Sequence, residues 1–164
     1  MKKTYQTITG RHLDVASLDA TERCFLGSVR QKFEEEPEWS AFATWWSNEL
    51  TAAGLSKSST SYRICQDLEA RLGIAQGTVA PPDYRDYLSD LIEERYGSRY
   101  RFCQETGIDP GHLSRVLSSR SDLSLKNLQR ILDTLHASLV IQHDEDLNEQ
   151  VSPRRAARNL VLAA

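Results

Sequence analysis

The side chains best suited to chemistry lie between residues 98 and 131, where basic residues outnumber acidic ones. This segment holds six cations and three carboxylates, in a chain whose net charge is -3. Guanidinium and ammonium groups bind phosphate oxygens, and a planar guanidinium can donate two parallel hydrogen bonds. The segment therefore predicts a surface that binds a polyanion. The cations are Arg99, Arg101, Arg115, Arg120, Lys126 and Arg130, and the acids are Glu105, Asp109 and Asp122.

Two short helices joined by a tight turn would position these cations. Apolar residues at helical spacing predict one helix over residues 99–106 and another over residues 110–118. Gly107 lies between them and supplies the positive φ that a tight turn needs. A turn of this kind holds two helices at a steep angle, as in a helix-turn-helix. The residues that would form the buried side of the pair are Phe102, Ile108, Leu113 and Val116.

The second helix of the pair would project far enough to enter the major groove of duplex DNA. Its outward side chains would be His112, Ser114 and Arg115, which are the candidates for hydrogen bonds to base edges. An arginine here can contact guanine O6 and N7, which discriminates against other bases by about 1–3 kcal/mol. The cations expected to contact the flanking phosphates are Arg99, Arg101, Arg120 and Lys126.

This segment resembles the helix-turn-helix of the XRE family, the phage-repressor-like DNA-binding proteins. The resemblance covers about residues 83–136, and residues 121–125 are similar to the family's loop into its fourth helix. It implies a five-helix bundle whose second and third helices form the motif, and a sequence-specific transcription regulator that binds double-stranded DNA. The residues that carry the resemblance are Phe102, Gly107, Ile108, Leu113, Ser114 and Val116.

The segment departs from the family pattern at four positions. Arg99 stands where the family usually has a phosphate-binding glutamine, and Cys103 stands where it prefers alanine. Pro110 and Gly111 occupy two positions that often carry base-reading side chains, and neither has a side-chain donor. Base reading would then fall on the three outward residues named above, so that specificity is modest or depends on DNA shape.

Further helices are predicted on both sides of the motif. Asp83 caps a helix that Gly97 ends, and Ser124 caps a helix over residues 125–135. The β-branched, apolar residues 138–142 predict a short strand, which could pair with its twin in a homodimer. Two recognition helices would then lie about 34 Å apart. The residues expected to point inward from the last helix are Leu125, Leu128, Ile131, Leu132 and Leu135.

The first half of the chain is also predicted to be mostly helical. Asp19 and Glu22 form a capping-box pattern at the start of one helix, and Gly54 is placed to end a second helix over residues 38–53. A third helix is predicted over residues 60–72, ended by Gly73. Residues 4–9 predict a short edge strand.

These patterns indicate an all-α protein of two parts, with one short C-terminal strand. Residues 73–82 contain two glycines and two prolines and predict a domain boundary. Residues 1–80 would form a helical dimerisation or partner-binding module, residues 81–143 the DNA-binding domain, and residues 144–164 a tail. A second helix-turn-helix around Gly54 is disfavoured, because it would place Glu49, Thr60 and Arg63 at apolar positions.

Several other functions find little support in the sequence. No nucleophile, phosphate-loop or metal-binding motif is present, so we expect no enzyme, metal or cofactor. The three cysteines, Cys24, Cys65 and Cys103, are too few and too far apart for a disulfide framework, and are expected to be buried in a reducing cytoplasm. No apolar stretch approaches the roughly 18 residues of a membrane span, and the first residues do not resemble a secretory signal.

Two alternatives to a simple regulator remain open. The chain could be an antitoxin-type regulator, whose first half or tail neutralises a toxin while the helix-turn-helix represses the operon. It could also be a protein-interaction module that no longer binds DNA, which Pro110 and Gly111 would explain. Residues 160–164 either resemble an apolar protease-recognition end or form an apolar patch that docks on the body of the protein.

Overall fold

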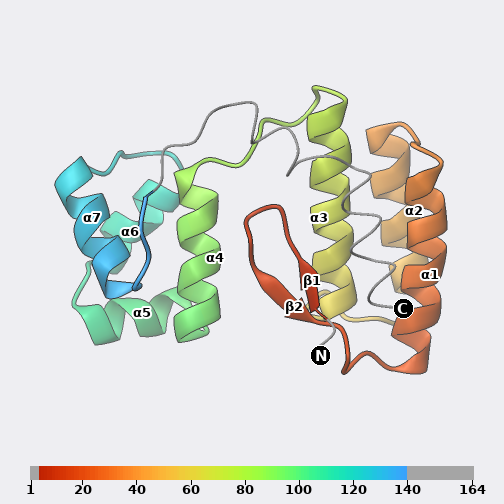
Figure 1. Ribbon diagram of the computed structural model, residues 1–164, viewed down its shortest axis with the longest axis horizontal. Coiled ribbons are helices and arrows are strands. Elements are labelled where there is room, and N and C mark those ends of the chain that lie inside the picture. The colour runs from red at the N-terminus through yellow and green to blue at the C-terminus, as the bar shows by residue number, and fades with distance from the viewer. Residues whose placement is uncertain (1–3, 140–164) are drawn as a thin grey trace. The chain divides into compact units, whose positions relative to one another are not determined.

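The computed structural model describes residues 4–139, which are mostly helical (Figure 1). They divide into two compact units, one ending at Pro81 and the other beginning at Pro82. Seven helices and one two-stranded sheet occur within this range. This sheet corrects the expectation of an all-α fold. It lies at the start of the chain, where a second strand pairs with the strand predicted over residues 4–9.

The N-terminal unit combines a β-hairpin with three helices. Strands β1 (Thr4–Gln6) and β2 (His12–Asp14) pair antiparallel, with Tyr5 opposite Leu13. Thr7 N donates to Arg11 O over 2.9 Å across the turn. The helices are α1 (Ala20–Glu34), α2 (Trp39–Ala52) and α3 (Thr60–Ala75), and each packs against the other two.

Apolar side chains from all three helices fill the core of this unit. Phe33 and Phe42 meet edge to face with ring centroids 5.7 Å apart, and Trp46 meets Tyr62 at 5.6 Å. The Trp46 indole also donates to Glu69 Oε2 over 2.9 Å, so its polar edge is satisfied. Trp45, on the neighbouring face of α2, is only partly buried against the same core.

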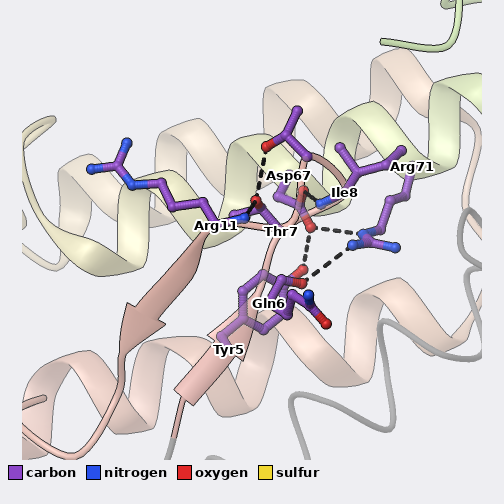
Figure 2. Close-up of polar contacts among 8 residues, drawn as sticks. Tyr5, Gln6, Thr7, Ile8, Arg11, Asp67 and Arg71 are labelled. Carbon is purple, nitrogen blue, oxygen red and sulfur yellow. Dashed lines mark hydrogen bonds and ion pairs between the residues drawn. The ribbon is translucent and has the colours of Figure 1, made fainter. Parts of the chain in front are cut away.

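A buried polar network joins the hairpin to α3 (Figure 2). The Asp67 carboxylate accepts hydrogen bonds from the Tyr5 hydroxyl and, over 2.6 Å, from the backbone N–H of Ile8. Arg71, one helical turn further on, pairs with the same carboxylate over 2.7 Å and donates to Gln6 O over 3.3 Å. Each charge is thus compensated inside the fold, which is the condition for burying it.

Two expectations for this unit are wrong. Gly73 does not end α3 but is buried within it, and a Cβ there would come within 2.4 Å of Val79 and 3.0 Å of the Trp39 ring. The glycine is required by this close packing, and α3 continues to Ala75. Cys24 is exposed on α1, whereas Cys65 and Cys103 are buried as expected.

The C-terminal unit consists of α4 (Tyr84–Tyr96), α5 (Arg99–Thr106), α6 (Pro110–Leu117) and α7 (Leu125–Thr134). Between residues 82 and 139 there are four helices, not the five that the family resemblance implies. Leu125 is 72% exposed, which corrects its predicted inward position, because it begins α7 beyond the edge of the core. Ser138 and Leu139 form no strand, and residues 140–142 of the predicted strand lie outside the described range.

Candidate nucleic-acid interface

Helices α5 and α6 are joined by a turn that the local sequence determines. Gly107 has φ +71°, and its N–H donates to Cys103 O over 3.0 Å, which ends α5. The Asp109 side chain then accepts from His112 N over 2.6 Å and caps α6. Pro110 occupies the first position of α6, where a missing N–H costs nothing. Two residues between Gly107 and the proline are therefore enough to change the chain direction.

The inner side of this helix pair is apolar and closely packed. Phe102 and Val116 are fully buried, and the Tyr96 ring meets the Phe102 ring edge to face at 5.0 Å. Ile108 lies in the turn between the helices, and Leu113 packs into the same core. Burial raises the pKa of the Cys103 thiol, so this residue stays protonated and packs as a small apolar group. The core therefore fixes which side of α6 faces outward.

The outer side of α6 is polar. Ser114 and Arg115 are exposed, and His112 is half-buried. A Cβ on Gly111 would lie 3.5 Å from Arg115 Nη1, so the guanidinium extends back over the first turn of α6. Two of the three predicted base-reading residues are thus accessible, and the third is partly so.

The predicted phosphate-binding cations differ in their surroundings. Arg99 donates to Ser89 Oγ over 2.9 Å, and Arg101 pairs with Glu105 over 2.6 Å within α5. The hydrogen bond to Glu105 raises the pKa of Arg101, which keeps it charged. Arg120 and Lys126 are exposed and have no carboxylate partner among residues 4–139, and the same holds for Arg115. Three cations of the set are therefore not neutralised within the described structure.

Arg85 is a residue of this surface that the sequence analysis missed. Its guanidinium donates to the Asp83 cap over 2.5 Å and to Asp122 in the loop before α7, and it lies 4.7 Å from the Tyr84 ring centroid. The hydrogen bond to Asp83 is the main cause of its raised pKa. Arg85 thereby ties the start of α4 to the loop that follows Arg120. An arginine two residues after an aspartate cap is the only local signal for it.

Residues 4–139 contain no group of three side chains able to hold a metal ion, and no helix there is long and apolar enough to cross a membrane. Comparison with known proteins gives no matching family model, no matching curated protein and no matching solved structure. What the α5–α6 surface binds must therefore be inferred from its own residues.

Proposed function

We propose that the chain is a DNA-binding transcription regulator that inserts α6 into the major groove. The observation that carries this proposal is the division of α6 into two sides. Leu113 and Val116 are buried, while Ser114 and Arg115 are exposed. Arg120, whose backbone N–H donates to Arg115 O over 2.8 Å, is also exposed, and neither arginine has a carboxylate partner in the described structure. A short exposed helix with a cationic outer face matches the shape and charge of the groove. The resemblance of residues 83–136 to the XRE family supports the same function.

Each side chain has a distinct role in the proposed complex. Arg115 contacts a guanine, with His112 and Ser114 beside it, and these contacts discriminate between sequences. Arg120 and Lys126 contact phosphates directly, and Arg99 needs only to release a neutral serine hydroxyl to do the same. Arg101 must exchange Glu105 for a phosphate, which is a small change because both partners are exposed. Arg85 holds the loop in place and does not contact DNA.

The test is to measure binding to a random duplex by fluorescence anisotropy across a range of salt concentrations. A DNA-binding protein loses affinity as salt rises, with a logarithmic slope of about -0.9 per phosphate contact. We expect Lys126→Ala and Arg120→Ala each to make the slope of log affinity against log salt shallower by about the amount of one phosphate contact. Arg23→Ala is the matched control, because Arg23 is an exposed arginine on α1. Binding that does not depend on salt would overturn the proposal.

The recognition of DNA bases by Arg115 is tested separately with the variant Arg115→Ala. We expect this variant to bind random duplex nearly as well as the parent but to lose preferred sites in a genome-wide binding map, at about 1–3 kcal/mol per guanine contact. An unchanged map would remove Arg115 from the reading role while leaving the DNA-binding function in place.

A protein-interaction module is the second candidate, and the first turn of α6 favours it. Pro110 and Gly111 offer no side-chain donor, and the exposed Asp109 carboxylate caps the end of the helix that would enter the groove. A carboxylate at this place repels phosphate. If binding to the random duplex does not depend on salt concentration, we assign the exposed face of α6 to a protein partner instead.

A further inference from the structure

The N-terminal unit carries an open groove between α1 and α2. Its volume is about 580 Å³, and Phe25, which is buried, forms part of its floor. The walls are made mostly of short side chains, with one carboxylate at the α2 side. The wall residues that matter here are Ala20, Cys24 and Ser28 from α1, Glu49 and Ala52 from α2, and Ala53 directly after α2.

Short side chains on both helices leave this groove unfilled by the N-terminal unit itself. Cys24, Ser28 and Ala52 are all exposed, although they flank a core that is otherwise closely packed. An added Cβ at Gly27, on the same helix, would meet no atom within 4 Å. The groove can therefore accept branched apolar side chains from another segment, and Glu49 can accept a cation beside them.

We propose that residues 154–162 of the same chain occupy this groove. This segment contains three arginines, Arg154, Arg155 and Arg158, followed by Leu160, Val161 and Leu162. The leucine and valine side chains are long enough to fill a groove whose walls are alanine, serine and cysteine. The arginines supply the opposite charge to Glu49.

The connection is long enough for this docking. The chain from Leu139 to Leu160 can span about 70 Å when extended. Leu139 belongs to the C-terminal unit and the groove to the N-terminal unit. Each unit has a radius of gyration of roughly 12 Å, so the connection is longer than the roughly 60 Å of the two diameters added together. A tethered segment also has an effective concentration in the millimolar range, which favours docking within one molecule over capture of a separate one.

Cys24 provides a direct readout of occupancy. It is the exposed cysteine of the three, and it lines the groove, whereas Cys65 and Cys103 are buried in the two cores. The rate at which Ellman's reagent modifies Cys24 in the folded, full-length protein therefore reports whether the groove is covered. The proposal predicts that the double variant Leu160→Asp and Leu162→Asp reacts at least tenfold faster than the parent chain.

A matched control separates charge from docking. The double variant Asn148→Asp and Gln150→Glu also adds two negative charges outside the described residues but leaves the apolar run intact. We expect its Cys24 rate to equal that of the parent. Circular dichroism must show the same helix content for all three proteins. Equal Cys24 rates in the parent and the leucine variant would overturn the proposal.

A cross-link identifies the occupant. In the single variant L162C, mild oxidation should join the new thiol to Cys24 within one chain, giving a monomer of altered mobility on a non-reducing gel. Cross-linked dimers in place of this monomer would overturn the intramolecular assignment and give the groove to a second copy. Neither measurement involves DNA, so its outcome is independent of the function proposed above.

Discussion

Charged residues lie in different places in the two units. In the N-terminal unit, Asp67 and Arg71 are only 7% and 2% exposed and compensate each other together with Tyr5. In the C-terminal unit, the buried residues within the described range are all apolar or cysteine, and every arginine and lysine there except Arg85 is exposed. A buried ion pair constrains how elements are aligned, whereas surface cations are available to a partner. The buried charges of the N-terminal unit therefore have a structural role, whereas we propose that the exposed cations of the C-terminal unit bind a partner.

The largest effect on this difference between the units is expected from removing the buried Asp67 carboxylate. Asp67→Ala would leave Arg71 buried without a partner and the Tyr5 hydroxyl without an acceptor. We expect the N-terminal unit to lose about 3–5 kcal/mol of unfolding free energy. Denaturant unfolding followed by tryptophan fluorescence measures this, because all three tryptophans lie in that unit.

The control is a pair with the same spacing on the surface. Arg30 and Glu34 are also four residues apart on one helix, but their side chains are 34% and 47% exposed. Glu34→Ala should cost only about 0.2–0.5 kcal/mol. If the two variants were destabilised equally, burial would not be what distinguishes the Asp67–Arg71 pair.

A smaller effect is expected from the turn of the C-terminal unit. Gly107→Ala places a Cβ on a residue with φ +71° and should cost about 1–2 kcal/mol, seen as faster hydrogen exchange of the α5 and α6 amides. Gly27→Ala in the interior of α1 meets open space and should instead stabilise its unit, by up to about 1 kcal/mol. Opposite signs from the same substitution would show that the turn, rather than glycine content, sets the cost.

The smallest effect near neutral pH concerns Tyr5. Burial, and then the Asp67 charge, raise the pKa of this tyrosine well above its usual value of about 10. The unfolded chain therefore ionises first, so the stability of the N-terminal unit is complete below about pH 10 and falls as pH rises beyond it. Tyr5→Phe should be less stable at neutral pH but should lose this alkaline dependence. Tryptophan-monitored unfolding at a series of alkaline pH values measures both, with Tyr62→Phe as the control.

The features that the sequence predicted correctly depend on neighbouring residues. Asp19 and Glu22 form the expected capping box, and Asp83 and Ser124 cap their helices. Gly54, Gly97 and Gly107 all have positive φ where helices end. Each of these signals involves residues within four positions of one another, so a single segment contains the whole cause. The roles proposed for Arg115 and the phosphate-binding cations stay predictions.

The features that the sequence analysis missed depend on residues far away in the chain, or on where the packed core ends. Asp67 accepts from Tyr5 and Ile8, about sixty positions earlier, and no periodicity links them. Gly73 reads as a helix end until Trp39 is known to pack on it. Leu125 and Cys24 lie on apolar helical stripes, but a stripe does not show where the neighbouring element stops covering it.

The link between Tyr5 and Asp67 spans 62 positions and has a consequence for biosynthesis. The first strand leaves the ribosome long before the helix that holds it has been translated. At about 5–20 residues per second, the nascent hairpin waits roughly 3–12 s for its acceptor. During this interval the tyrosine and its neighbouring amides are solvated, and the hairpin can dock only once α3 has emerged.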